Sequence, residues 1–306
     1  MQPVNIAIAD IGSNSLKLSV THVGSRGEQR VMHAAAITVR LGYNVAVTGV
    51  MEPSRIERAL EALRNYEKVA QNLGATVFIG VATAAVRMAG NGSEFLSRIA
   101  KDTDWKVSVI SGDEEAELAF LGLQSDLPGT GAQIILDIGG ASTEIIQVID
   151  GAISASQSIQ LGSGTLADRF LATDPPGIPA VRAARTYGDE VFEAEAGPVV
   201  RGTSLYVTGG NGMFLSQIAA WDVVRLPFVV PFFPLLVDRL AEIPSDQVAA
   251  HLAITPERAR MLPAGAAIVW SLIDIVSPVD MFAVQSGIRG GLIRRWIAGH
   301  DAITSS

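Results

Sequence analysis

The chain contains no cysteine, and this single absence excludes several kinds of chemistry. Without thiols the protein can form no disulfide bond, no cysteine nucleophile and no thiolate metal site. Such a composition suits a reducing compartment, so we expect a cytoplasmic protein. Basic residues are also scarce, because 23 Lys and Arg stand against 31 Asp and Glu, for a net charge of −8. Since proteins that bind nucleic acids in general carry a basic face, we expect no nucleic-acid partner.

Long hydrophobic runs are missing too. The most apolar stretch, residues 223–237, contains Arg225 and three prolines, so it is too short and too broken to cross a bilayer. We expect a buried segment of the second half there, with a hydrophobic homodimer contact as the alternative. The first residues, Met-Gln-Pro-Val-Asn, lack the basic region of a signal peptide. The sequence therefore predicts no membrane association.

What is present is a globular composition, with 306 residues of which 48% are hydrophobic, enough for two domains with cores of their own. The most informative stretch is residues 133–144, where an apolar strand ends in Asp137, a Gly-Gly turn follows and small hydroxylated residues lead to Glu144. The glycines let backbone N–H groups converge on an anion, and the carboxylates can hold a hard cation. A nucleotide or polyphosphate site is the first hypothesis, and a plain glycine-rich hairpin is the alternative.

The same pattern occurs near the N-terminus. A strand from Val4 to Asp10 is followed by Ile-Gly-Ser-Asn-Ser and by a second, alternating strand from Leu16 to Thr21. Each loop joins two strands, whereas a Rossmann or P-loop turn would open a helix, and no G-x-x-x-x-G-K-[ST] motif occurs. Two Asp-Ile-Gly hairpins, one in each half, predict duplicated domains that face each other across a cleft.

Hydrophobic periodicity between the hairpins predicts an α/β domain. It includes a helix from Pro53 to Leu73 capped by Ser54, and strands over residues 76–81 and 105–110. The second half repeats this alternation, with helices over residues 165–171, 178–196 and 264–276, a short strand over residues 282–284, and a last helix containing Arg294 and Arg295. The boundary is expected where Ser, Asp, Pro and Gly cluster, so the predicted domains are 1–124 and 125–306.

Acidic residues crowd the start of one predicted helix, where Asp113 is expected to act as the cap and Glu114 and Glu115 follow. The helix dipole alone favours such residues, by ~0.3–1 kcal/mol each, which is a structural explanation. A carboxylate after a strand is also where α/β sheets place their chemistry. Because Glu114 and Glu115 point about 100° apart on a helix, at most one of them faces a given cleft.

Two further glycine-rich turns have open interpretations. Residues 162–167 read formally as G-x-G-x-x-A, which is a weak dinucleotide signal and most simply the start of a helix. The strand over residues 205–208 runs into Gly209-Gly210-Asn211-Gly212, with a helix from Met213 onward. Glycines there let either a ligand or a neighbouring strand approach the backbone closely.

Five motifs in order resemble the exopolyphosphatase/guanosine-pentaphosphate phosphohydrolase family of the actin-like ATPase superfamily. Each motif is weak alone, but their order along most of the chain is specific. None of them contains one of the four histidines, which argues against a His-dependent phosphatase and against a Ser-His-Asp hydrolase. The motifs are D-I-G-S-N-S at Asp10 to Ser15, A-T-x-A-x-R at Ala82 to Arg87 with Asn91, Glu94 and Phe95, I-S-G-x-E-E-A at Ile110 to Ala116, D-I-G-G-G-S-T-E at Asp137 to Glu144, and G-L-R-E-G within Ser286 to Gly291.

The resemblance implies two actin-like (ribonuclease H-like) domains with mixed sheets flanked by helices and an active site in the interdomain cleft. It implies Glu115 as the catalytic base, leaving Glu114 as a cap, and Asp10, Asp137 and Glu144 as carboxylates for metal and phosphate, with Asp137 also catalytic. The implied phosphate-binding positions are Gly12, Ser13, Asn14, Gly139, Gly140, Ser142 and Thr143, to which the turn adds Gly209 and Gly210. The candidate substrate cations are Arg87, Arg258 and Arg289, then Lys17 and Arg40, with a structural salt bridge as the alternative for each.

This assignment suits phosphoanhydride cleavage, which needs an in-line water, a base and positive potential on the terminal phosphoryl oxygens. Mg²⁺ or Mn²⁺ would supply charge, and backbone N–H groups would add more. The expected substrate is inorganic polyphosphate, with guanosine penta- or tetraphosphate as the alternative. Two further hypotheses are a sensor that binds these nucleotides without turnover and an actin-like ATP-dependent kinase that shares both hairpins.

Two positions depart from the family pattern. Ala141 replaces the third glycine of the second loop, which is tolerable only if φ is negative there, and Gly290 replaces the glutamate of G-L-R-E-G. Either change could weaken phosphate binding or shift its preference. The chain also looks like the short two-domain members, which favours shorter substrates.

Overall fold

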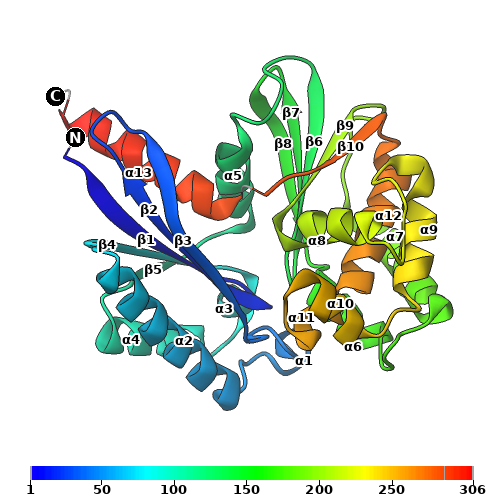
Figure 1. Ribbon diagram of the computed structural model, residues 1–306, viewed down its shortest axis with the longest axis horizontal. Helices are drawn as coiled ribbons and strands as arrows, with labels where there is room; N and C mark the ends of the chain where they lie inside the picture. The colour runs from blue at the N-terminus through cyan, green and yellow to red at the C-terminus, as the bar shows by residue number, and fades with distance from the viewer. Residues whose placement is uncertain (1, 286, 305–306) are drawn as a thin grey trace. The chain divides into compact units, whose positions relative to one another are not determined.

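The computed structural model describes residues 2–285 and 287–304, and internal contacts divide the chain into two compact units (Figure 1). The first unit takes residues 1–122 together with 288–306, and the second takes residues 123–287. The sequence assigns residues 288–306 to the second domain, so the structure corrects that assignment for the last helix. The reason is a run of apolar residues on that helix that packs on the first sheet.

The first unit is built on a mixed five-stranded sheet in the order β3-β2-β1-β4-β5. Strand β1 pairs antiparallel with β2 and parallel with β4. The strands are β1 (Val4–Ile11), β2 (Ser15–Val23), β3 (Gln29–Thr38), β4 (Val77–Ala82) and β5 (Lys106–Val109). The helices of this unit are α1 (Val45–Thr48), α2 (Pro53–Asn72), α3 (Ala84–Met88), α4 (Gly92–Asp102), α5 (Gly112–Leu123, which ends at the unit boundary) and α13 (Ile288–Thr304).

Alternation along β1 gives the first sheet two apolar faces, each covered by helices. Ala7 and Ala9 belong to a buried cluster with side chains of α2 and α4. Ile6 and Ile8 face the other way, into a cluster completed by Leu118 of α5 and by Ile288, Leu292 and Ile293 of α13. Figure 1 shows α13 lying along β1 and β2.

The second unit repeats the first sheet strand for strand, because its order β8-β7-β6-β9-β10 has the same directions. The duplication predicted from the two hairpins is therefore present as a fold. The strands are β6 (Ala132–Ile138), β7 (Thr143–Ile149), β8 (Ala152–Ile159), β9 (Ser204–Thr208) and β10 (Asp280–Ala283). The helices are α6 (Ser163–Phe170), α7 (Ile178–Glu195), α8 (Gly209–Ala220), η1 (Val230–Phe232), α9 (Phe233–Leu240), α10 (Ser245–Leu252), α11 (Pro256–Ala259) and α12 (Leu262–Val276).

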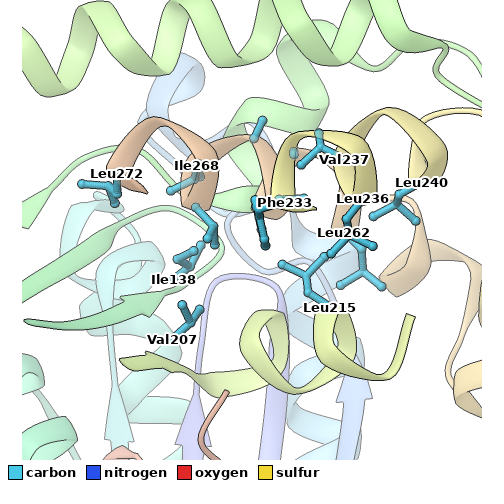
Figure 2. Packing of buried hydrophobic residues seen from close by; sticks show 14 of the residues in the cluster. Ile138, Val207, Leu215, Phe233, Leu236, Val237, Leu240, Leu262, Ile268 and Leu272 are labelled. Carbon is cyan, nitrogen blue, oxygen red and sulfur yellow. The ribbon is translucent and has the colours of Figure 1, made fainter. Parts of the chain in front are cut away.

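One large apolar cluster holds the second unit together. Ile138 and Val207 contribute to it from the sheet, and Figure 2 shows them facing side chains of α8, α9 and α12 such as Leu215, Phe233 and Ile268. The expectation that residues 223–237 contain buried core is confirmed for Phe233, Leu236 and Val237. Other apolar side chains of that stretch stay partly exposed, among them Val223, Val229, Phe232 and Leu235.

One helical stretch among the described residues, 256–276, is long and apolar enough to cross a membrane by length and composition. Of its apolar window, 78% is buried inside the protein. A core helix of a globular domain passes the same test, so this is weak evidence for a span.

Several local expectations are wrong. Strands β3 and β8 were not predicted, because their many small and polar residues have low strand propensity and they pair only with β2 and β7. Ser54 is not a cap, because α2 starts at Pro53 after Glu52 and no side chain caps it. The helix after β9 begins at Gly209, four residues before the expected Met213.

The assignment of α13 to the first unit can be tested with Ile293→Ala, which removes a side chain that is 2% exposed. We expect a loss of about 2–5 kcal/mol in unfolding free energy, because a buried cavity replaces the side chain. Hydrogen exchange should accelerate in peptides covering β1 and stay unchanged in those covering β6. The control Val31→Ala changes a side chain that is 62% exposed in the same unit and should be near neutral. Faster exchange in β6 alone would contradict the assignment.

Candidate functional site

The two hairpins adopt the same turn. Gly12 N–H donates to the carbonyl of Ser15 at 3.2 Å, and Gly139 N–H donates to the carbonyl of Ser142 at 2.9 Å. A Cβ atom on Gly12 or Gly139 would lie 3.0 or 3.1 Å from that same carbonyl oxygen. Both positions therefore favour glycine because the chain folds back closely on itself, and neither has a positive φ.

The start of α6 satisfies the carbonyl groups of the second turn. Gly139 C=O accepts from Ser163 N–H at 3.0 Å and from the Ser163 hydroxyl at 3.1 Å. Gly140 C=O accepts from the N–H groups of Gly164 at 2.9 Å and Thr165 at 3.1 Å. Because both peptide units are trans, their N–H groups, those of Gly140 and Ala141, point away from α6.

These two N–H groups have no acceptor in the part of the chain that the structure describes. Adjacent N–H groups that point the same way form a concave anion site, at no cost in net charge. The second turn can thus hold an oxyanion such as a phosphoryl group. Ala141 does not disturb it, because its φ is not positive. The methyl group therefore costs no backbone strain at this position.

The first turn is held in a matching way by the segment after β3. Ser13 C=O accepts from Gly42 N–H at 2.8 Å, and Asn14 C=O accepts from the N–H groups of Val39 at 3.0 Å and Arg40 at 2.8 Å. The Ser13 hydroxyl accepts from Ala85 N–H at 3.1 Å. The segments after β3 and β8 therefore both donate hydrogen bonds to the carbonyl groups of the hairpin turn in their own unit.

The carboxylates differ between the two hairpins. Asp10 lies opposite Lys17 in the strand register, and its carboxylate accepts from the Lys17 ammonium at 3.2 Å. The corresponding pair in the second unit is Asp137 and Glu144. Glu144 is fully buried and accepts from the Ser158 hydroxyl at 2.8 Å. One hairpin therefore presents a neutralised pair, and the other presents two neighbouring carboxylates.

A third turn adds to the second hairpin. Gly209 has φ +71°, and a Cβ atom there would lie 3.1 Å from Asp137 Oδ1. A Cβ atom on Gly210 would lie 2.4 Å from Arg258 Nη2, so this guanidinium rests on the glycine backbone and over the Phe214 ring at 5.8 Å. Asn211 donates to the Ile138 carbonyl at 2.8 Å, just before the turn. The β9–α8 turn thus contacts Asp137 of the second hairpin through Gly209 and Arg258 through Gly210.

Arg258 differs from the other candidate cations. Burial lowers the pKa of its guanidinium to about 10, which still leaves it protonated at neutral pH. Among the described residues its guanidinium has no hydrogen-bond or carboxylate partner. A half-buried cation in this position has charge available for a polyanion.

Glu115 and Glu114 occupy different surroundings at the start of α5. Ser111 N–H donates to Glu114 Oε2 at 2.9 Å, and Glu114 N–H donates to the Ser111 hydroxyl at 3.1 Å, which is a capping box. The expected cap Asp113 is therefore wrong, and Glu114 has the structural role. Glu115 is 5% exposed and its Oε2 lies 3.6 Å from Arg87 Nη1, which also donates to the Ile110 carbonyl at 2.6 Å.

The remaining candidates have contacts inside the protein. Arg289 donates to the Leu18 carbonyl at 2.9 Å, and Thr143, fully buried, donates to the Leu161 carbonyl at 2.5 Å. Arg40 lies 4.8 Å from the Tyr43 ring. Ser286, the first residue of the last motif, lies outside the described residues. The roles assigned to these residues stay predictions.

The donor set suits a hard divalent cation at the second hairpin. Within residues 2–285 and 287–299, whose side chains the structure describes, no cluster of three or more His, Asp or Glu side chains forms a ready metal cage. Mg²⁺ is often held by only one or two carboxylates together with substrate phosphates. Asp137 and Glu144, directly opposite each other, are such a pair, whereas Asp10 already binds Lys17.

Sequence reasoning missed the residues that hold the turns. Gly42 is one of them, because a Cβ atom there would lie 2.8 Å from Ser13 Cβ. Gly162 is another, because a Cβ atom there would lie 2.4 Å from Ala141 N and from Gly140 C. Asn211 and Ser163 complete the set. The available signal was a glycine shortly after the third strand in each half, but β3 and β8 themselves are hard to identify.

Two copies of this mixed sheet, each with a hairpin turn closed by the same hydrogen bond after its first strand, define an actin-like fold. The particular family follows from comparison. The model of the Ppx/GppA phosphatase family matches residues 20–300, and the chain belongs to this family.

Named relatives and solved structures agree with this membership. Exopolyphosphatase 2 of Mycobacterium tuberculosis (strain H37Rv) is 32% identical over 325 aligned residues, which cover 99% of this chain and 97% of the relative. A guanosine-5′-triphosphate,3′-diphosphate pyrophosphatase of Pseudoalteromonas atlantica is 27% identical, over 94% of this chain but 57% of the relative. An exopolyphosphatase structure from Cytophaga hutchinsonii has the same fold, with TM-score 0.84 at 24% identity over 96% of this chain and 98% of that one.

The backbone conformations of Ala141 and Gly209 predict a loss of stability for two substitutions that run in opposite directions, alanine to glycine at 141 and glycine to alanine at 209. Ala141→Gly should lower the unfolding free energy by about 0.4–1 kcal/mol, because φ is not positive there and glycine adds freedom to the unfolded chain. Gly209→Ala should cost about 1 kcal/mol or more, since its φ is +71° and Asp137 lies close. Urea denaturation measures both. Stabilisation by Ala141→Gly would contradict the geometry of the turn.

Proposed function

We propose that the protein is an exopolyphosphatase, which hydrolyses the terminal phosphoanhydride bond of inorganic polyphosphate and releases orthophosphate. The observation that carries the proposal is the second hairpin turn, where the N–H groups of Gly140 and Ala141 point away from α6 and have no acceptor among the described residues. Family membership and the full-length similarity to an exopolyphosphatase support the same substrate class.

The hairpin turns are proposed to hold phosphoryl oxygens. Their backbone N–H groups stabilise the charge that builds up on these oxygens during the reaction, and they do so without adding a cation. Arg258, half-buried against Gly210, supplies positive charge for the neighbouring phosphates of the chain. Binding by backbone N–H groups and a single arginine suits a protein whose net charge is −8, because it needs few cationic side chains.

Glu115 is proposed as the general base. A water molecule attacks the terminal phosphorus in line, the bond from that phosphorus to the bridging oxygen breaks, and the shortened polyphosphate leaves with the electron pair. The proton of the attacking water passes to the Glu115 carboxylate. Arg87, 3.6 Å from Glu115 Oε2 and bonded to Ile110, keeps the carboxylate in one place. The interdomain placement of the active site stays a prediction.

A divalent metal is part of the proposal. Asp137 and Glu144 would hold Mg²⁺ or Mn²⁺, and the bound ion would neutralise charge on the phosphate chain. Asp10 is the weaker ligand candidate because its carboxylate already binds Lys17. The role proposed for Asp10 is to orient that ammonium toward substrate.

Guanosine pentaphosphate is the second candidate substrate, because hydrolysis of its terminal 5′-phosphate is the same reaction. The relatives named for that substrate support it less, since the alignment covers 57% of one of them. A sensor without turnover is a third hypothesis. The geometry at Ala141 weakens that hypothesis, because the methyl group causes no strain in the turn.

The decisive experiment compares phosphate release from polyphosphates of defined length and from guanosine pentaphosphate, with Mg²⁺, with Mn²⁺ and with a chelator. Glu115→Gln should lower kcat by about 10²–10⁴-fold and leave KM nearly unchanged, because it removes the base and keeps the shape. Glu114→Gln is the matched control at the adjacent position. It should keep kcat, since glutamine also forms a capping box.

Each result decides a separate point. Wild-type activity of Glu115→Gln would overturn the base assignment, and equal losses in both variants would point to damage to α5. Binding of polyphosphate without phosphate release by the wild type would replace the hydrolase by a sensor. Consumption of ATP only with an added alcohol or acid acceptor would favour a kinase.

Arg258 offers a second prediction. Arg258→Ala should raise KM for polyphosphate by roughly 10–100-fold, because a charge-assisted hydrogen bond is worth about 1.5–3 kcal/mol. Arg260→Ala, two residues away and exposed, is the control and should leave KM unchanged. Steady-state kinetics at two salt concentrations measure both. Equal effects of the two substitutions would assign the change to net charge alone.

A further inference from the structure

The segment Gly162–Thr165 carries a glycine motif that the proposed reaction does not use directly. We propose that this segment is a positioning element for the second hairpin turn, with Gly162 and Ser163 as the residues that set the direction of its anion-binding N–H groups. The proposal rests on the proposed function for the identity of the anion, but its geometry stands by itself.

The first step is the capture of two carbonyl groups. Three consecutive N–H groups at the start of α6, those of Ser163, Gly164 and Thr165, donate to the carbonyls of Gly139 and Gly140. The Ser163 hydroxyl adds a second bond to Gly139. The first N–H groups of a helix have no partner within the helix and can bind an anionic ligand. Here they bind the hairpin, so the dinucleotide interpretation of this motif has no donors left for a pyrophosphate.

The second step is the effect on the opposite side of the same peptide units. In a trans peptide the N–H points opposite to the C=O, so fixing two carbonyls on α6 fixes the N–H groups of Gly140 and Ala141. A hydrogen bond to the carbonyl also polarises the peptide and strengthens its N–H as a donor. The N–H groups at the start of α6 therefore act on an anion indirectly, because they orient and polarise the peptide units whose N–H groups face it.

The third step explains why position 162 is glycine. A Cβ atom there would lie 2.4 Å from Ala141 N and from Gly140 C, both backbone atoms that cannot rotate away. The segment itself is fixed as well, because Thr165 Oγ1 accepts from Gly162 N–H at 3.1 Å and donates to Gly162 C=O at 3.0 Å. Any side chain at 162 must push the turn and α6 apart.

The experiment measures anion affinity separately from turnover. The probe is methylenediphosphonate, whose carbon bridge is not hydrolysed, titrated by calorimetry with Mg²⁺ present. Gly162→Ala should weaken binding about 100-fold, because the turn must shift by a large part of an ångström. Ser163→Ala should weaken it about 3–10-fold, because one of two bonds to Gly139 is lost. KM for tripolyphosphate should rise in parallel in both variants.

The matched control is Gly129→Ala in the same unit, where a Cβ atom would meet nothing within 4 Å. It should bind the probe as the wild type does. Melting temperature is measured for all variants, and Ser163→Ala keeps the test sharp if Gly162→Ala does not fold. Weakened binding in a folded Ser163→Ala supports the positioning role, and wild-type affinity in both variants overturns it.

The outcome separates this inference from the proposed function. A wild type that binds the probe but releases no phosphate, with variants that lose binding, would keep the positioning role and overturn the hydrolase. An active wild type whose variants bind the probe normally would overturn the positioning role alone.

Discussion

The site depends on the fixed opposition of C=O and N–H in a trans peptide unit. A turn can offer N–H groups to an anion only if the carbonyl groups behind them find donors within the protein. In the second unit these donors are the first N–H groups of α6, and in the first unit they come from the segment after β3. The third strand of each sheet therefore contributes to the proposed anion site, since the chain that follows it holds the turn.

The two units share one sheet topology, and they differ in the residue that lies opposite the aspartate of each hairpin. The two sheets share strand order, hairpin hydrogen bond and a glycine that allows the supporting segment to approach. Opposite the aspartate, however, the first hairpin has Lys17 and the second has Glu144. A lysine neutralises its partner, whereas a second carboxylate concentrates negative charge that a divalent cation can offset. The same fold therefore presents two different arrangements of charge at equivalent positions.

The sequence predicted the hairpins, the duplication and the family, because short motifs and period-two strands are local signals. It did not predict β3 and β8, whose alanine- and serine-rich residues become strands only through pairing. It singled out the glycine motif at residues 162–167 but missed the contact of Gly162 with the second turn, because that turn is distant in sequence. It also placed the α5 cap at Asp113, although Ser111 and Glu114 bond reciprocally. The site assignment of Glu115 came from the motif, since periodicity alone leaves Glu114 and Glu115 equivalent.

The proposed substrate is a polyanion, whereas the protein has a net charge of −8, so attraction has to come from groups close to the substrate. Three of the candidate cations, Lys17, Arg87 and Arg289, bind Asp10, Glu115 or a backbone carbonyl. Such contacts fix side chains in place but reduce the charge they offer at long range. Backbone N–H groups escape this limit, because they are oriented by covalent geometry and act only at hydrogen-bond distance. Attraction of this kind favours a phosphoryl group that fits the turn over polyanions in general.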